Sequence, residues 1–403
     1  MTINRKTLIL VIGGTAAVIL IALGILWYIN RPDKTKTVKN LFGILPQIGE
    51  SGGGGGGGGD TTIPPGGIEE EGGTGGETDG EIDGEEAVET ELLQIVKKPI
   101  LGATLTADGG KIIYYVRSGG KLEMIDFSGG AAEQVSPLTI VGMFDVVWQD
   151  AKRRSVVSYQ EGTTVKRFIN TTATTGVVFL PKDIRSFDFS PDSRSLAYLL
   201  PKGDATQLIT ATEDGKTPRV VFETPIPDFS LLWIAPKKIL LQSAPSNQSP
   251  GIVYLFDTGT KALEKIFGTI RGNMTIASPD GAALLTSFVG EDGRIALALT
   301  NQKGEIPKTI TPPTLAEKCV FTKDAKTILC AIPQNDADLP DAWLRGDMAL
   351  QDQFVRIPPD TLVAEGISDK TQIDAINLFL SPDEQYLFFQ DKNDLTLWRL
   401  KLK

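Results

Sequence analysis

The chain lacks the side chains that most enzymes use for acid–base and metal chemistry. It contains no histidine, which removes the commonest general base, the usual base of serine triads and the commonest zinc ligand. The two cysteines, Cys319 and Cys330, are too few for a structural zinc site with four N or S ligands. We therefore expect no catalytic residues, no metal site and no cofactor, and we predict that the chain is not an enzyme.

An insertion between Cys330 and Phe354 gathers the side chains best suited to binding. Long loops on a rigid scaffold often carry function, so we expect a binding loop here. The alternative is a solvated insertion in which Trp343 and Leu344 cover the end of a sheet. The acidic residues lack the Asp-x-Asp-x-Asp-Gly spacing of a calcium loop. The candidate residues are Asp336, Asp338, Asp341, Trp343, Arg345 and Asp347.

The net charge of −10 is confined to one part of the chain. From Leu92 onward lie 34 of the 40 basic residues and 36 of the 50 acidic residues, so this part is nearly neutral. The excess acid falls between Asp60 and Glu91, where no Lys or Arg occurs. No basic face of the kind that binds nucleic acid is present, and we expect no nucleic-acid partner.

The N-terminal segment predicts a membrane anchor. After a tail of residues 1–6, residues 7–29 are uncharged and mainly apolar. A helix of that length would span the hydrocarbon core of a bilayer, roughly 30 Å thick. A cleaved signal peptide is the alternative, but its apolar region is normally only about 7–15 residues long. We predict one uncleaved transmembrane helix, with the protein in the cell membrane.

Residues 30–90 predict a disordered linker. The run of glycines at 52–59 and the acidic stretch after it cannot bury enough apolar surface to offset the entropy of ordering. We expect a spacer, with an acidic binding tail as the alternative. Lys and Arg residues flanking the helix would place the C-terminal side in the cytoplasm. The stalk-like linker and the short N-terminal tail favour an extracytoplasmic position, which we predict.

One pattern recurs through residues 91–403: an apolar residue, two others, Asp, three others and a second apolar run. Two runs rich in β-branched and aromatic residues flank a turn, in which Asp accepts hydrogen bonds from backbone amides. The steps of 42, 42, 44, 44, 44 and 59 residues match the roughly 40–45 residues of a four-stranded propeller blade. We interpret these aspartates as turn residues. They are Asp108, Asp150, Asp192, Asp280, Asp324 and Asp383, with Pro236 at the remaining position.

These repeats predict an all-β fold, a seven-bladed β-propeller of four-stranded antiparallel blades. The last repeat ends after its third strand, and residues 91–98 precede the first repeat as an outer strand would. We expect residues near Leu92–Val96 to pair beside Leu395–Leu402. Such pairing would close the ring and remove exposed sheet edges.

Three Ser-Pro-Asp turns carry a resemblance to known proteins. Ser190-Pro191-Asp192, Ser278-Pro279-Asp280 and Ser381-Pro382-Asp383 resemble the turns of TolB-like propeller repeats, and more broadly those of WD-repeat proteins. The resemblance covers about residues 92–403 and implies architecture alone, because this turn is shared by proteins of many functions. The Gly-His and Trp-Asp signatures of strict WD repeats are missing, and TolB-like propellers often have six blades.

The two cysteines face each other in the expected sixth repeat. Phe321 precedes the turn and Ile328 follows it, which places Cys319 directly opposite Cys330. A disulfide between such partners needs a small local adjustment, since opposed Cβ atoms are about 4.5–5.5 Å apart. The alternative is two small buried hydrophobic residues.

These expectations favour a non-catalytic binding or scaffolding propeller, anchored at the cell envelope, with a protein or envelope polymer as its partner. The first alternative is a glycan- or peptide-cleaving enzyme that uses paired carboxylates in the propeller channel. The second is a purely structural envelope protein. Fold alone does not decide among them.

Overall fold

The structure is a computed structural model that describes residues 92–402, except 173–175, 306 and 336–338. The predicted tail, membrane helix and linker, residues 1–6, 7–29 and 30–90, lie outside the described residues. No helix within the described part of the chain is long and apolar enough to cross a membrane.

Three antiparallel sheets of four strands follow one another along the first half of the described chain. In each sheet the strands lie in sequence order, as expected when hairpins connect neighbouring strands. Their bounds are β2 (Ile100–Leu105), β3 (Ile112–Val116), β4 (Leu122–Ile125) and β5 (Glu133–Ser136); β6 (Met143–Trp148), β7 (Arg154–Glu161), β8 (Thr164–Thr171) and β9 (Val177–Phe179); β10 (Ser186–Phe189), β11 (Ser195–Lys202), β12 (Ala205–Thr212) and β13 (Arg219–Thr224).

The next sheet has seven strands because one long strand serves two neighbouring groups. The first part of β17 pairs with β16 and its last part pairs with β18. Between them, Gly272 has a φ of 64°, and the register shifts there. The strands are β14 (Phe229–Ala235), β15 (Lys238–Ser243), β16 (Pro250–Asp257), β17 (Leu263–Ala277), β18 (Ala283–Val289), β19 (Ile295–Asn301) and β20 (Lys308–Ile310).

Two further four-stranded sheets complete the arrangement, and the second joins the two ends of the described chain. Leu92 on β1 lies opposite Leu400 on β27, so the predicted pairing of these segments is confirmed. The elements are η1 (Ala316–Lys318), β21 (Cys319–Phe321), β22 (Ile328–Pro333), α2 (Asp341–Arg345), β23 (Asp352–Ile357) and β24 (Glu365–Gly366); β25 (Ala375–Leu380), β26 (Tyr386–Asp391), β27 (Leu397–Lys401) and β1 (Leu92–Val96).

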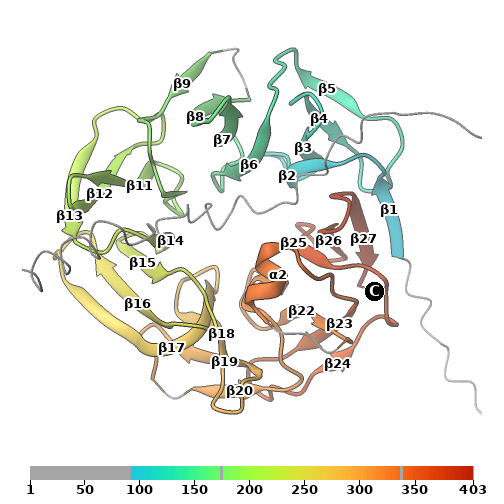
Figure 1. The fold of residues 1–403 in the computed structure, drawn as a ribbon. Helices are drawn as coiled ribbons and strands as arrows, with labels where there is room; N and C mark the ends of the chain where they lie inside the picture. Colours follow the sequence, from blue (N-terminus) through green and yellow to red (C-terminus); the bar gives the residue numbers. More distant parts are fainter. Residues whose placement is uncertain (1–91, 173–175, 306, 336–338, 403) are drawn as a thin grey trace, which may run out of the picture. The chain divides into compact units, whose positions relative to one another are not determined.

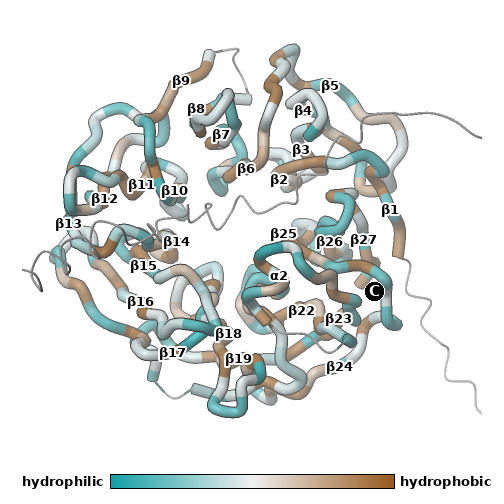
Figure 2. Tube along the Cα trace, in the orientation of Figure 1, coloured by the Kyte–Doolittle hydropathy of each residue, from teal (hydrophilic) through white to brown (hydrophobic). Residues whose placement is uncertain are grey.

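The sheets of residues 92–402 lie in chain order around a common centre, with β2, β6 and β14 toward the inside and β1, β5, β9 and β13 at the periphery (Figure 1). Hydrophobic residues are concentrated on the strands (Figure 2), and they pack between neighbouring sheets. Leu101 and Tyr115 of one sheet, for example, pack against Val157 and Phe168 of the next. The described chain is therefore all-β, as predicted.

The recurrent aspartates form the predicted turns in most repeats. Asp192 accepts hydrogen bonds from Ser190 Oγ at 2.6 Å and from the backbone N–H of Arg194 at 3.1 Å. These bonds favour the ionised carboxylate and lower the pKa of Asp192, with the Ser190 bond the largest cause. Asp108, Asp280, Asp324 and Asp383 accept the same pair of bonds.

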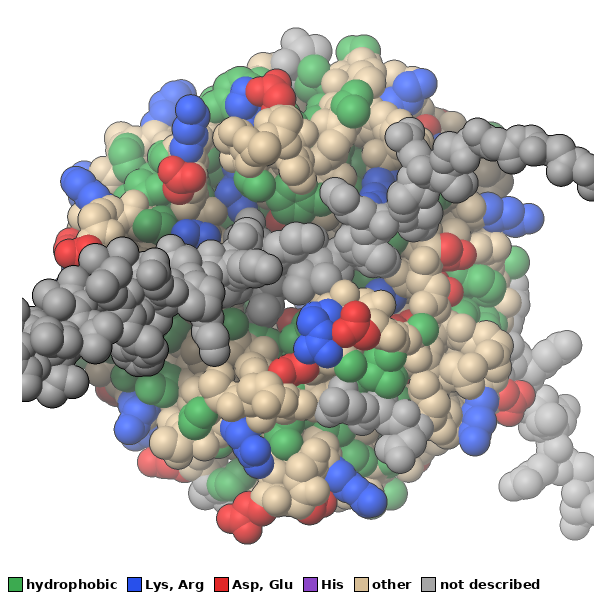
Figure 3. Space-filling model, viewed as in Figure 1, with side chains coloured by type: hydrophobic (Ala, Val, Ile, Leu, Met, Phe, Trp, Pro, Cys, Tyr) green, Lys and Arg blue, Asp and Glu red, His purple; other side chains and the backbone are tan. Residues whose placement is uncertain are grey.

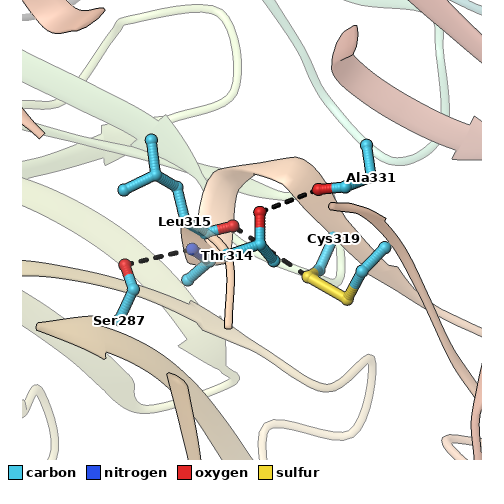
Figure 4. Close-up of a disulfide and its surroundings, with 7 residues drawn as sticks. Ser287, Thr314, Leu315, Cys319 and Ala331 are labelled. Atoms are coloured by element: carbon cyan, nitrogen blue, oxygen red, sulfur yellow. Dashed lines mark hydrogen bonds between the residues drawn. A yellow bond between two sulfur atoms is a disulfide. The ribbon is translucent and has the colours of Figure 1, made fainter. Parts of the chain in front are cut away.

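A disulfide joins β21 to β22 in the structure (Figure 4). Cys319 pairs with Cys330 in the register that the sequence predicted. Both residues are buried. The turn before β21 is fixed by Thr314 Oγ1, which donates to the carbonyl of Ala331 at 2.7 Å, and by Ser287 Oγ, which accepts the N–H of Ala316 at 3.1 Å.

Candidate functional site

The predicted binding loop contains a short helix whose central residue points inward. Trp343 on α2 is only 3% exposed and packs with Leu315, Leu339 and Leu350. Its indole N–H donates to the carboxylate of Asp374, at 2.9 and 3.1 Å from the two oxygens. In this conformation Trp343 anchors the loop and does not present a surface to a partner.

Of the other candidate residues in that loop, one holds the loop in place and two are exposed. Asp341 accepts the backbone N–H of Asn247 at 2.8 Å and a hydrogen bond from Ser246 Oγ at 3.2 Å, so it ties the loop to a neighbouring connection. Arg345 and Asp347 are exposed and lie 2.7 Å apart, and they stay candidates for contact with a partner. Two further candidates, Asp336 and Asp338, lie outside the described residues.

A different group of titratable side chains meets at the inner strand β10. Asp188 accepts the N–H of Trp233 on β14 at 2.8 Å and the N–H of Phe189 at 2.9 Å. The turn after β6 is held beside it, because Ala151 N–H donates to Ser193 Oγ at 2.9 Å. That turn carries Asp150 and Lys152, and we call Asp150, Lys152 and Asp188 the inner-edge site.

The charged groups of the inner-edge site influence one another's pKa. Burial raises the pKa of Asp188 to about 7; nearby Asp150 adds to the rise and Lys152 opposes it. Asp150 is exposed to solvent, but nearby protein atoms desolvate its carboxyl and raise its pKa. Desolvation also lowers the pKa of Lys152, whose charged form both carboxylates favour. The site thus holds a carboxyl that is half protonated near neutral pH beside a second carboxylate and an amine, which suits general acid–base chemistry.

Asp150 lies in the turn after β6, as the sequence predicted, but it does not make the hydrogen bonds of the other turn aspartates. Gln149 occupies the turn position that Ser190 holds in the next repeat, since its N–H bonds to the carbonyl of Arg154 as that of Ser190 bonds to Ser195. Asp150 therefore lies one residue before the position that corresponds to Asp192. No described backbone amide donates a hydrogen bond to it. A signal was available: Ser or Thr stands two residues before each of the other five aspartates, whereas Trp148 precedes Asp150.

A second polar row lies on the sheet that begins with β6. Asp145, Ser158 and Arg167 are direct cross-strand neighbours, and Ser158 Oγ donates to Asp145 at 3.4 Å. Burial raises the pKa of Asp145 to about 6, against the attraction of Arg167. Arg167 is 5% exposed, and its buried Nε has no hydrogen-bond partner among the described residues.

Glu317, on η1, is a third carboxyl with a raised pKa. The residue is exposed to solvent but surrounded by protein atoms, and this desolvation raises its pKa to about 7. Desolvation accounts for that rise. Of these three carboxyls, only Asp188 has both a carboxylate and an amine as charged neighbours.

Charged residues of both signs are interspersed over the face in view in Figure 3, without a patch of one sign.

A groove of about 510 Å³ lies beside β7 and β9, and Val141, Phe179 and Tyr159 line it. Nothing in the structure shows what would cover this groove.

No protein-family model matches the chain, and no curated protein matches it. Several solved structures do align with this chain. An oligogalacturonate lyase from Vibrio parahaemolyticus aligns with a TM-score of 0.56 at 10% identity, over 79% of this chain and 95% of that one. An oligogalacturonate lyase in complex with manganese gives 0.56 at 11% identity, over 79% and 94%. The fold is that of a β-propeller.

Two further structures complete the comparison. Tricorn protease aligns with a TM-score of 0.53 at 10% identity, over 79% of this chain and 34% of that one. TolB from Acinetobacter baumannii aligns over 76% of this chain and 64% of that one at 11% identity, but its TM-score of 0.42 is too low to argue from. The propeller fold that the sequence resemblance implied is supported by the two lyases and by tricorn protease.

These likenesses overturn the prediction of a non-catalytic propeller and the prediction that the chain is not an enzyme. The structures that the fold matches are named as a lyase and a protease. Their architecture is compatible with catalysis, so missing histidine and sequence motifs were insufficient grounds for that exclusion. At these identities the comparison shows the fold alone, and chemistry has to be argued from the side chains of this chain.

The residues present do not fit the manganese of the second lyase structure. Histidine is absent from the whole chain. Within the described residues, no three His, Cys, Asp or Glu side chains come together as metal ligands would. The chemistry of the inner-edge site is therefore derived from its carboxyls and amine.

Proposed function

We propose that this chain is a glycan-cleaving enzyme whose acid–base centre is the inner-edge site. The observation that carries the proposal is that the turn after β6, which carries Asp150 and Lys152, is bonded to the turn after β10 through Ala151 N–H and Ser193 Oγ, with Asp188 as a charged neighbour. Glycan cleavage commonly requires one carboxyl that is protonated and another that is ionised at the working pH. The match of the fold to two oligogalacturonate lyases supports a glycan over a peptide as the substrate.

The roles follow from the environments. Asp188, with its pKa raised to about 7, donates a proton to the departing glycosidic oxygen. Asp150 accepts a proton from the attacking water, and Lys152 beside it opposes the rise that desolvation causes in the pKa of Asp150. Lys152 favours the ionised form of both carboxyls and compensates negative charge that develops on the substrate.

The test is cleavage by the purified full-length chain. It would be incubated with polygalacturonate, chitin oligosaccharides and a neutral glucan, and new reducing ends would be counted. Ultraviolet absorbance would report the unsaturated products of elimination and so separate elimination from hydrolysis. We expect new reducing ends from at least one glycan, with a maximum rate between about pH 6 and 7.

Matched variants connect that activity to the site. Asp188→Asn should lower kcat by at least about 100-fold, since general acid catalysis contributes about 10²–10⁴-fold. Asp228→Asn, which changes an exposed aspartate between β13 and β14, should leave the rate unchanged. Equal rates in the wild type and Asp188→Asn would show that the site is not catalytic. Cleavage of peptides in place of glycans would contradict the substrate class.

We also propose that the sheets form seven blades, with β17 counted as the outer strand of one blade and the inner strand of the next. This proposal is supported by the two pairing halves of β17 and by the repeat steps in the sequence. An experimental structure with another number of blades would contradict it.

Membrane anchoring remains part of the proposal. The uncharged segment 7–29 and the linker 30–90 support an enzyme tethered at the cell membrane, outside the cytoplasm, with an envelope polymer as its substrate. Carbonate-resistant sedimentation with membranes, together with protease accessibility from outside intact cells, tests both the anchor and its orientation. Release of the chain by carbonate would contradict the anchor.

A further inference from the structure

Three charged side chains meet beneath α2 in a place that water does not reach. Lys318 Nζ lies 2.8 Å from Asp352 Oδ2 and 2.7 Å from Asp374 Oδ1, and none of these side chains is exposed. Lys318 Nζ also donates to the carbonyl of Ala375 at 2.8 Å. Buried charges normally carry a large desolvation cost, so this cluster requires a physical account.

The two carboxyls of the cluster have different environments. Asp374 accepts hydrogen bonds from the indole N–H of Trp343, from the N–H of Leu350 at 3.0 Å and from Lys318. Asp352 accepts the N–H of Ala375 at 2.7 Å and Lys318 Nζ, both on Oδ2.

The second oxygen of Asp352 is without a partner. Its Oδ1 is buried and accepts no hydrogen bond from any described residue. Burial is the largest influence on Asp352 and raises its pKa, although Lys318 opposes the rise. The Lys318 amine therefore lies against a buried carboxyl that has one oxygen without a partner, and the Asp374 carboxyl lies beside both.

We propose that Lys318 and Asp352 condense spontaneously into an intramolecular amide bond, with Asp374 as the proton acceptor. The contact distance, the exclusion of water and the unpartnered Oδ1 carry this proposal. It is independent of the proposed glycan cleavage, since the cluster is buried and uses none of the residues of the inner-edge site.

The reaction balances without any further reactant. Asp374 removes one proton from the Lys318 ammonium, and the neutral amine attacks Cγ of Asp352. The Nζ–Cγ bond forms, the Cγ–OH bond breaks, and the hydroxyl leaves as water with a second proton from Nζ. The products are a secondary amide, one water and protonated Asp374, so one cation and one anion are replaced by neutral groups in a buried place.

The product would cross-link one sheet twice. The amide would join η1 to β23, and the disulfide between Cys319 and Cys330 already joins β21 to β22 in the same sheet. Covalent bonds would then connect three successive segments of the sheet that carries the long insertion.

Intact-mass spectrometry of the purified full-length chain tests the proposal. After reduction of the disulfide, the mass should be about 18 Da below that of the sequence, which corresponds to one lost water. Because cyclisation at an Asp-Gly step gives the same loss, the chain must also be digested. Trypsin should yield a branched peptide that contains Lys318 and Asp352, with no cleavage after Lys318.

Two variants discriminate the roles. Asp374→Asn keeps both partners but removes the proton acceptor, so the branched peptide should fall at least tenfold. Lys392→Gln is the matched control, because Lys392 also lies over the Trp343 ring but donates to the Trp343 carbonyl; it should retain the branched peptide. An unmodified wild-type mass, or a loss confined to linear peptides, would overturn the proposal, whatever the outcome of the glycan assay.

Discussion

Leu92 lies directly opposite Leu400 in an antiparallel pair, although the two residues stand at the two ends of the described chain. Leu400 also pairs with Leu387 on its other side and is completely buried. The last sheet therefore depends on contacts between the most distant parts of the sequence. Loss of this pairing would expose the edge of β27 and the hydrophobic surface beside it.

The first prediction concerns this closure. Leu400→Ala should lower the free energy of unfolding by about 2–5 kcal/mol, because it leaves a cavity in a fully buried position. Lys401→Ala, on the exposed neighbouring residue, should change it by less than about 0.5 kcal/mol. Urea denaturation of the two variants measures the difference. Similar stabilities would mean that the pairing of the ends contributes little.

The second prediction is a decrease in stability as the pH rises from 4 to 7. The pKa of Asp188 is about 7 in the folded chain, above the value of an unfolded aspartate. Within this interval the unfolded state is ionised and the folded state holds the proton. The contribution of Asp188 is complete below the unfolded pKa and is lost as the pH rises through the folded pKa.

Urea unfolding at several pH values measures that slope. Asp188→Asn should reduce the slope, since asparagine does not titrate. Asp145 and Glu317, with pKa values raised to about 6 and about 7, should maintain part of it. An unchanged slope in the variant would show that Asp188 has an ordinary pKa.

The third prediction concerns Trp343. Trp343→Ala should destabilise the chain by about 3–5 kcal/mol, because the indole is buried and bonded to Asp374. Trp343→Phe keeps much of the packing but removes the indole donor, and should cost about 1–3 kcal/mol. Thermal unfolding measures both, with exposed Arg345→Ala as the control. Unchanged stability of Trp343→Ala would restore a role in recognition.

The fourth prediction concerns the cysteines. Cys319 and Cys330 should resist alkylation in native protein, because both are buried in the disulfide. Replacing both with Ala should lower the free energy of unfolding by about 2–4 kcal/mol. Alkylation of the denatured chain before and after reduction provides the direct measurement. Two free thiols without reduction would contradict the disulfide, and would also weaken the extracytoplasmic location.

The sequence by itself determined the local structure of this protein. Alternating apolar residues specified the strands, and a Ser or Thr two residues before Asp specified turns such as that of Asp192, because those bonds form between near neighbours. The turn between Phe321 and Ile328 also predicted that Cys319 lies opposite Cys330. The pairing of Leu92 with Leu400 was also predictable, since one strand was missing from the last repeat.

The tertiary structure alone decided which polar residues meet. Lys318, Asp352 and Asp374 are far apart in sequence and come together only when two sheets pack. Asp188 looked like any strand residue until the neighbouring turn placed Lys152 beside it. Periodicity describes which side of a strand a residue occupies, but a pKa depends on burial and on charges contributed by other strands. For that reason the sequence predicted the scaffold and missed the inner-edge site.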